Sequence, residues 1–301
     1  MIRTVDSTSV RSGVRSGVRS DARSGARGDV DPRWPLTKRV RRGWIIEILV
    51  GAGIYLLYDW LRDQATGSAA AALAHAHQVV DVEKSFGIYQ ERAIQEAFRS
   101  AHWFMSFWNI WYGTIHFVMP LVALVVLYRK LPARYVRWRN TLLCMLGISL
   151  VAFWMYPLMP PRLMPSSYGF VDGAARYFNF GPQVKVQFGA NGQPTAAAVA
   201  QFGNLFAAMP SLHIGWSTWT MFALWPAVHR PWAKVLLACY PLTIFFCIVV
   251  TANHWILDAV GGLVALTLGW CCAMGLEWAL ARRRERIIDV VEEPAEALEP
   301  A

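Results

Sequence analysis

Long apolar runs separated by shorter polar stretches occupy most of residues 44–276. A helix needs about 20 residues to cross the hydrocarbon core of a bilayer. Six runs come close to or exceed this length: Trp44–Leu61, Ala101–Tyr128, Asn140–Met159, Met209–Ala227, Val235–Ala252 and Trp255–Leu276. The pattern therefore predicts an all-α, polytopic integral membrane protein built as a bundle of six transmembrane helices.

Two polar segments interrupt the apolar pattern. Residues His75–Arg99 have an amphipathic pattern, which predicts a helix lying on the outer membrane surface. Residues Pro160–Ala208 are rich in Gly, Asn, Gln and aromatic side chains and predict a long outer loop between the third and fourth helices. Loops of this length commonly serve as lids over functional sites or are disordered.

The composition excludes an ordinary pair of soluble domains, although 301 residues would suit one. Hydrophobic residues make up 55% and charged residues only 16% of the chain, and its mean hydropathy is +0.30. Soluble domains carry about 25% charged residues. The 15 Trp residues are typical of side chains that anchor helices at the membrane interface. All five Cys lie in apolar runs, so no disulfide scaffold is expected.

The positive charge is unevenly distributed, and its distribution predicts the orientation. Of the 29 Lys and Arg residues, 22 lie in four groups that six crossings would place on one side of the membrane: 1–43, 129–139, 228–234 and 279–301. The positive-inside rule assigns these groups to the cytoplasm. We therefore expect a plasma-membrane protein with both termini cytoplasmic, and no nucleic-acid partner despite the net charge of +9.

The charged groups and the apolar runs together divide the chain into three parts. Residues 1–43 are low in complexity, with Arg repeated among Ser and Gly, and predict a disordered basic cytoplasmic tail. Residues 44–278 form the six-helix membrane domain, and residues 279–301 form a cytoplasmic C-terminal tail.

Three polar islands fall at the predicted outer ends of helices. They are Pro160–Pro165 after the third span, Met209–His213 at the start of the fourth, and Asn253–Gly262 at the start of the sixth. The islands lie far apart in the sequence but on the same side of the predicted membrane. We therefore expect them to converge on one extracytoplasmic site.

His254 and Asp258 are four residues apart, so they share one face of a helix. An Asp within a membrane span costs about 2.5–3.5 kcal/mol on insertion scales, which calls for a partner or a role. A carboxylate beside an imidazole fixes its tautomer and leaves the far nitrogen a better nucleophile. The alternative is a buried pair that only packs two helices together.

The other two islands supply groups suited to an anion. His213 follows Pro210 and Ser211, whose helix start offers backbone N–H groups and a hydroxyl to a phosphate. Arg162 adds a cation whose geometry suits bidentate phosphate binding. Together these residues predict a phosphate cradle with one nucleophilic and one proton-donating histidine. Alternatively, Ser211 is only a helix cap and Arg162 only extends to the membrane interface.

Pro-Ser-Leu-His at 210–213, followed by His-x-x-x-Asp-x-x-Gly-Gly from His254, resembles the type 2 phosphatidic acid phosphatase superfamily. Pro-Pro-Arg ahead of these motifs is similar to the inositol phosphorylceramide synthase-like branch. The resemblance covers roughly residues 101–276. It implies a six-helix catalytic core in which His254 attacks phosphorus and becomes phosphohistidine. It further implies that Asp258 supports His254, that His213 protonates the leaving group, and that no metal or other cofactor is needed.

Two cations of the family pattern are missing. Soluble and lipid-phosphatase members carry Lys, six residues and then Arg-Pro, where this chain has Met155 and then Arg162-Leu163. Those members also carry Ser-Arg before the nucleophilic His, at positions that are Cys247 and Ile248 here. We expect Arg162 alone, or Arg162 with two further cations of the outer loop, to bind the phosphate; those cations are Arg176 and Lys185.

The predicted activity is transfer of a phosphoryl or phospho-alcohol group from a lipid phosphate in the bilayer to water or, with a slight preference, to an acceptor hydroxyl. Asn109, Tyr112 and His116 form a polar stripe on the second span that lines the substrate pocket or bonds to neighbouring helices. Two other interpretations stay open. One is a zinc-dependent membrane hydrolase that uses the same two His and one Asp, and the other is a non-catalytic lipid transporter.

Overall fold

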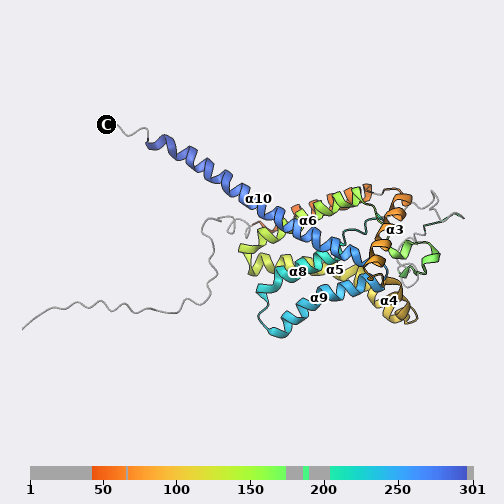
Figure 1. The fold of residues 1–301 in the computed structure, drawn as a ribbon. Helices are drawn as coiled ribbons and strands as arrows, with labels where there is room; N and C mark the ends of the chain where they lie inside the picture. Colours follow the sequence, from red (N-terminus) through yellow and green to blue (C-terminus); the bar gives the residue numbers. More distant parts are fainter. Residues whose placement is uncertain (1–42, 66, 174–185, 190–203, 297–301) are drawn as a thin grey trace, which may run out of the picture. The chain divides into compact units, whose positions relative to one another are not determined.

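The computed structural model describes residues 43–65, 67–173, 186–189 and 204–296, with only the backbone described for 287–296. These residues are predominantly helical (Figure 1). The α-helices are α2 (Trp44–Gln64), α3 (Ala69–Ser85), α4 (Glu91–Phe98), α5 (His102–Lys130), α6 (Pro132–Met155), α8 (Leu212–Leu224), α9 (Pro231–Val250) and α10 (Ile256–Glu296). Short 3-10 turns occur at η1 (Pro161–Leu163), η2 (Ser166–Tyr168) and η3 (Trp225–Ala227).

Five helices in the described part of the chain are long and apolar enough to cross a membrane. They are α2, α5, α6, α9 and residues Ile256–Arg286 of α10. The prediction of a helical, multi-pass membrane protein is therefore confirmed. These helices correspond to the first, second, third, fifth and sixth spans expected from the sequence.

The fourth predicted span, Met209–Ala227, contains the short helix α8. Its 13 residues would extend about 20 Å at 1.5 Å per residue, less than the hydrocarbon thickness. It packs against α5, α6, α9 and α10, and most of its side chains are buried. Six spans therefore stay a prediction, because α8 alone is shorter than a membrane span.

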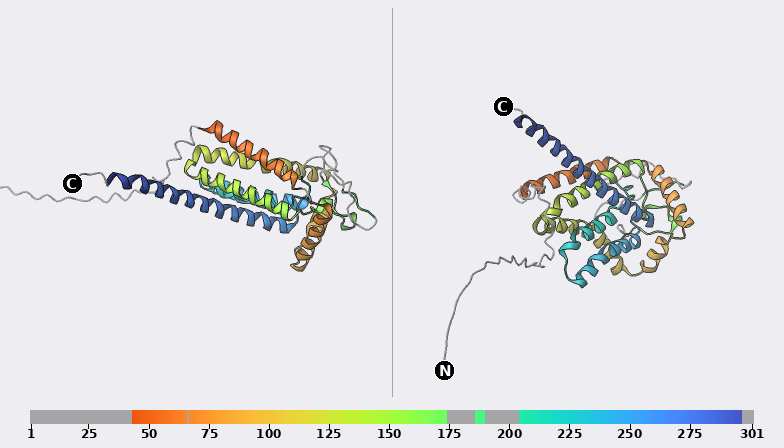
Figure 2. Two further views of the ribbon diagram at one scale, coloured as in Figure 1. Left: turned by 90° about the horizontal axis from the view of Figure 1, so that it is seen from above. Right: turned by 60° about the vertical axis from the view of Figure 1, so that its left-hand side comes forward.

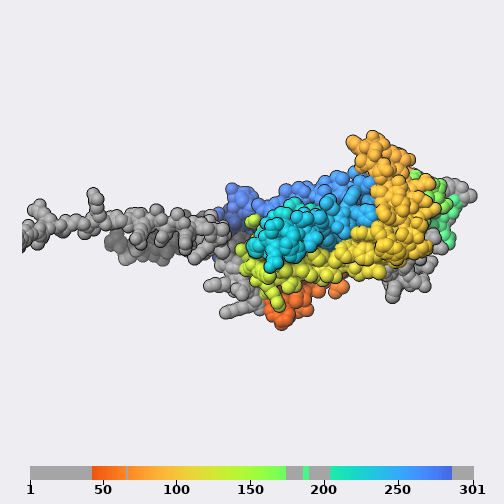
Figure 3. Space-filling model, turned by 90° about the horizontal axis from the view of Figure 1, so that it is seen from below, coloured from red at the N-terminus to blue at the C-terminus, as the bar shows by residue number. Residues whose placement is uncertain are grey.

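The long helices run side by side, and α3 and α4 lie across the end of the bundle where α10 begins (Figures 1 and 2). Figure 3 shows these two helices, coloured orange to amber, covering that end. The segment His75–Arg99 is thus two helices separated by a turn at Gly87, whose φ of 68° suits glycine.

A cluster of buried apolar side chains holds α3 against the bundle. Leu73, Val79 and Val80 of α3 pack with Met159 and Trp255 in this cluster. Trp255 is fully buried, and its indole Nε1 donates a hydrogen bond of 2.9 Å to the carbonyl of Met159. The residue next to His254 is therefore locked into the packed end of the bundle.

Glycines allow α8 and α10 to approach closely. A Cβ atom added at Gly262 would lie 2.3 Å from the carbonyl oxygen of Ser211, and one at Gly261 would lie 3.4 Å from Cα of Pro210. On the facing helix, a Cβ at Gly215 would lie 3.4 Å from the carbonyl oxygen of Gly262. Small residues at such contacts bring backbones together, and here they bring two of the polar islands together.

Several predicted segments are tested only in part. The basic tail at residues 1–43 lies outside the described residues except for Gly43, and so does much of the loop at 160–208. Position 278, the predicted end of the membrane domain, lies within α10, which continues as helix to Glu296. The division into three parts therefore stays a prediction.

Candidate active site

His254 lies in the turn between α9 and α10, two residues before α10 begins. Its Nδ1 lies 2.9 Å from the carbonyl oxygen of Ala208 and 3.2 Å from Oδ2 of Asp258. Both neighbours accept hydrogen bonds, so Nδ1 carries the proton and the Nε2 lone pair is free. Nε2 is buried and has no hydrogen-bond partner in the described part of the chain.

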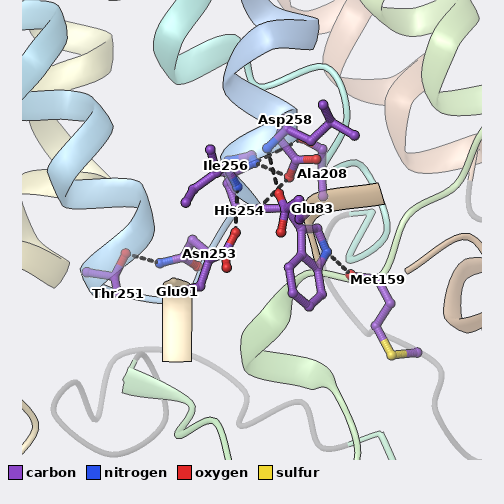
Figure 4. Close-up of polar contacts among 11 residues, drawn as sticks. Glu83, Glu91, Met159, Ala208, Thr251, Asn253, His254, Ile256 and Asp258 are labelled. Carbon is purple, nitrogen blue, oxygen red and sulfur yellow. Dashed lines mark hydrogen bonds and ion pairs between the residues drawn. The ribbon is translucent and has the colours of Figure 1, made fainter. Parts of the chain in front are cut away.

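Asp258 is fully buried and holds the turn that carries His254 (Figure 4). Its Oδ2 accepts hydrogen bonds from Nδ1 of His254 and from the backbone N–H of Trp255, the latter at 3.0 Å. Its backbone carbonyl accepts the N–H of Ser211 at 3.0 Å, which joins α10 to the start of α8. The predicted His254–Asp258 pair is therefore present in the structure.

His213, in the first turn of α8, lies next to His254. The centroids of the two imidazole rings are 5.3 Å apart, and the rings meet edge to face. His213 also stacks on Tyr112 at 4.1 Å and contacts His116 at 4.0 Å. Nε2 of His213 is buried without a hydrogen-bond partner among the described residues. The two histidines expected to converge from separate polar islands are thus neighbours.

The polar stripe of α5 faces two different surroundings. Tyr112 and His116 lie against His213, and Nδ1 of His116 is bonded to the carbonyl of Tyr112 at 2.5 Å. Asn109 instead donates to the carbonyl of Met105 in its own helix. Two of the three stripe residues therefore border the histidine pair.

Ser211 precedes α8 in the N-cap position, but its side chain makes no capping bond there. The hydroxyl is buried and has no partner within the described ranges. The interpretation of Ser211 as a simple side-chain helix cap is therefore wrong, and the hydroxyl is available for another hydrogen bond.

Arg162 lies in η1 and is tied to the turn that precedes His254. Its backbone N–H donates a 2.8 Å hydrogen bond to the carbonyl of Ala252, a residue held in the left-handed region at φ 55°. Its guanidinium forms an ion pair of 3.2 Å with Asp172. Nε of Arg162 is buried and lacks a partner in the portion of the chain described.

A cavity of about 210 Å³ opens beside His254. Arg162, Tyr112, His254 and Asn253 line it, as do two polar residues that carried no motif in the sequence, Arg62 and Asn204. Ser211 and His213 are not among the residues lining this cavity, and Asp258 lies behind His254. The first and third predicted islands thus line one cavity together with the end of α2. The second island does not line it and reaches the site through the contact of His213 with His254.

Arg62, in the last turn of α2, adds a second guanidinium to this cavity. It forms ion pairs with Asp59 at 2.8 Å and Asp63 at 3.1 Å, while its Nε is buried without a partner among residues the structure describes. Asn204 donates to the backbone carbonyl of Arg62 at 3.1 Å. In the sequence, Arg62 was notable only as one of the seven Lys and Arg residues that lie outside the four groups assigned to the cytoplasm.

A model of the PAP2 superfamily matches residues 77–272, about two thirds of the chain. The chain belongs to the PAP2 superfamily. Membership in the PAP2 superfamily suggests a phosphatase-type activity on lipid phosphates in a membrane protein. No curated protein and no solved structure matches the chain.

The positions at which this PAP2 chain lacks the expected cations are not in the cavity. Met155 ends α6 with 78% of its surface exposed, on the outside of the bundle. Ile248 is fully buried among apolar side chains, and Sγ of Cys247 lies 3.3 Å from the carbonyl of Trp108. Arg176 and Lys185, the other expected cations, lie outside the described residues.

The zinc interpretation requires a set of ligands with metal-binding geometry. Within the described ranges, no group of three or more His, Cys, Asp or Glu side chains could hold a metal ion. His213, His254 and Asp258 therefore do not form such a set in this PAP2 structure.

Proposed function

We propose that this PAP2 protein transfers the phosphoryl group of a membrane lipid phosphate or diphosphate through a phosphohistidine on His254. The observation that carries the proposal is the free, buried Nε2 of His254 beside a cavity lined by two arginines. A nucleophile held in its reactive tautomer next to fixed positive charge is suited to attack on phosphorus.

In the first step, Nε2 of His254 bonds to phosphorus as the bond between phosphorus and the leaving oxygen breaks. His213 gives a proton to that oxygen, so a neutral alcohol leaves a phosphomonoester. The imidazole of His254 becomes positively charged, and the carboxylate of Asp258 stabilises it through Nδ1. Proton transfer by a positioned histidine contributes typically 10²–10⁴-fold to such rates.

In the second step, an oxygen nucleophile attacks phosphorus and the bond to Nε2 breaks. His213, now neutral, takes the proton of the attacking water or hydroxyl. Water gives inorganic phosphate, and an alcohol gives a new phosphate ester. Both steps need His213 beside the reacting phosphorus, in keeping with its 5.3 Å ring distance from His254.

We assign phosphate binding to Arg162 and Arg62, which line the cavity, and to Ser211, whose buried hydroxyl lacks a partner among the described residues but would have to reach the phosphate from outside the cavity lining. The two guanidiniums line the cavity, and each is oriented by a carboxylate: Asp172 for Arg162, and Asp59 and Asp63 for Arg62. Arginine suits this task because its planar group offers several donors to phosphate oxygens. Arg62 would thus replace one of the two cations that the family motifs usually carry and that this chain lacks.

The proposed orientation places the site at the outer face of the plasma membrane and both termini in the cytoplasm. It requires α8, continued by η3, to cross the membrane as the fourth of six spans. The distribution of Lys and Arg supports this topology through the positive-inside rule. A lipid could then keep its tails in the bilayer while its phosphate meets the histidine pair.

Transfer to an acceptor hydroxyl is favoured over hydrolysis by Pro160-Pro161-Arg162, which resembles the inositolphosphotransferase branch. On this reading the lipids are inositol-containing or polyprenyl phosphates. The formation of phosphohistidine on His254 is the same whether water or an alcohol is the acceptor.

The test is to incubate purified, detergent-solubilised protein with lipid phosphates labelled with ³²P and to quench during turnover. We expect acid-labile, base-stable label on the wild-type protein at His254, and none on His254→Ala. His102→Ala is the matched control, since His102 begins α5 away from the cavity residues. Turnover that persists in purified His254→Ala would refute the mechanism.

Adding myo-inositol or a long-chain alcohol to the same reaction separates the two second steps. A labelled ester that grows with the alcohol concentration at the expense of free phosphate indicates transfer. Release of free phosphate alone indicates a phosphatase.

A further inference from the structure

The first turn of α10 is held by three carboxylates, two of which come from outside the bundle helices. The backbone N–H of Ile256 donates to Oε1 of Glu91 at 2.8 Å, and that of Leu257 donates to Oε1 of Glu83 at 2.7 Å. Asp258 accepts the N–H of Trp255. Figure 4 shows Glu83 and Glu91 close to His254 and Asp258.

These contacts fill a place that is usually open to ligands. The first N–H groups of a helix have no partner within the helix, and together with the helix dipole they form an anion site. Here resident side chains take the N–H groups of the first three positions of the turn. A substrate phosphate therefore cannot bind at the start of α10 and must approach His254 from the cavity side.

Glu83 and Glu91 are both fully buried. Their Oε2 atoms find no donor among the described residues. Their Oε1 atoms accept from the adjacent N–H groups of Ile256 and Leu257, so the two carboxyl groups are neighbours. Two neighbouring buried carboxylates repel each other strongly, and if both were charged each Oε2 atom would lack a donor. One proton between the two Oε2 atoms supplies the missing hydrogen bond and removes one of the charges.

The surroundings of Glu83 favour its protonated form. Burial, and then the neighbouring Glu91 carboxyl, raise the pKa of Glu83 to about 9, and the negative charge of Asp258 acts in the same direction. The Leu257 N–H opposes this shift. Ionisable groups nearby include His254, in the turn before α10, and Tyr89, between α3 and α4.

We propose that Glu83 and Glu91 share one proton and act as positioning residues, fixing the turn that carries His254 and Asp258. Glu83 donates its proton to the carboxylate of Glu91, and each accepts one backbone N–H of α10 with its remaining oxygen. The single negative charge left on the pair faces the positive end of the helix dipole. The role in catalysis rests on the proposed function, whereas the shared proton does not.

Glutamine substitutions test the shared proton directly. In Glu83→Gln, the amide oxygen accepts the Leu257 N–H and the amide NH₂ donates to Glu91, so the pattern survives; Glu91→Gln is the mirror case. In the double variant two NH₂ groups face each other and the negative charge is gone. We expect each single variant to keep kcat within about threefold, and the double variant to lose at least tenfold at unchanged KM.

The matched control is Glu96→Gln on α4, an exposed carboxylate paired with Arg99, which should leave kcat unchanged. Each variant is purified as the full chain and assayed for release of phosphate from a lipid phosphate in detergent. Its melting temperature is measured from pH 5 to pH 9.5. Wild type should lose stability progressively as the pH rises toward about 9, because the folded protein keeps a proton on Glu83 that the unfolded chain has released, and Glu83→Gln should lose less.

Three outcomes would overturn the proposal: a tenfold loss of kcat in either single variant, a double variant equal to the singles, or the same high-pH loss of stability in Glu83→Gln as in wild type. If the double variant does not fold, the single variants and their pH dependence still decide. If wild type turns over no lipid phosphate, the proposed function fails, while the melting curves test the shared proton independently.

Discussion

Replacing Asp258 by Asn tests the link between the structure and the proposed mechanism most directly. In the folded protein, one carboxylate oxygen accepts hydrogen bonds from both Nδ1 of His254 and the N–H of Trp255. Asparagine keeps the shape and one acceptor oxygen but removes the negative charge. The imidazolium formed when His254 binds phosphorus would then lose its charged partner.

The magnitude follows from the bonds that change. A hydrogen bond to a charged group contributes about 1.5–3 kcal/mol. Each 1.36 kcal/mol changes a rate tenfold. We therefore expect kcat to fall by about 10- to 150-fold in Asp258→Asn. KM should stay within about twofold, because Asp258 lies behind His254 and does not line the cavity.

The assay is the initial rate of phosphate release from a lipid phosphate in detergent micelles, over a range of lipid mole fractions. A melting curve checks that the variant is folded. Asp81→Asn, which changes an exposed acid on α3, is the control and should behave as wild type. A folded Asp258→Asn protein with kcat within threefold of wild type would refute the role given to this carboxylate.

Further predictions concern the cavity, the helix contact and pH. Arg62→Gln should raise KM for a lipid phosphate about tenfold or more while leaving the melting temperature within a few degrees, and an unchanged KM would remove Arg62 from the binding site. Gly262→Ala places a methyl group 2.3 Å from the carbonyl oxygen of Ser211 and should lower the melting temperature clearly, whereas Gly275→Ala, which meets nothing within 4 Å, should not. Because the pKa of Glu83 is raised in the folded state, the folded protein binds more protons than the unfolded chain above about pH 4.5. The free energy of unfolding should therefore fall as the pH rises toward about 9, and denaturant titrations at several pH values would reveal a contribution of the opposite sign.

The sequence could predict site residues that form a recognisable pattern with close neighbours in the chain. The four-residue spacing of His254 and Asp258 and the presence of an acid in an apolar run predicted their pairing, which the structure shows. The predicted shared helix face was wrong, because His254 lies in the turn before α10 and Asp258 reaches back to it. The convergence of His213 with His254 followed from the topology, since both begin segments on the same predicted side. The stripe residues Tyr112 and His116 were recognised as a set, although not which of their neighbours they contact.

Residues whose role depends on distant backbone could not be predicted. Glu83 and Glu91 lie in an amphipathic stretch where acids normally face water, and their burial depends on N–H groups of α10 more than 160 residues away. The apolar run containing α8 has the composition of a span, and periodicity does not distinguish a membrane span from a helix buried in a core. Arg62 carries no motif, and only folding brings it to the cavity.

The position of Arg62 has a consequence for how specificity could diverge among related enzymes. The region matched by the superfamily model starts at residue 77 and does not include α2, yet the last turn of α2 forms one wall of the cavity beside His254. A chimera that received another first helix would keep both histidines and their carboxylate partner. We would expect such a chimera to keep the proposed chemistry but to accept different lipid headgroups, because the replaced helix lines the cavity.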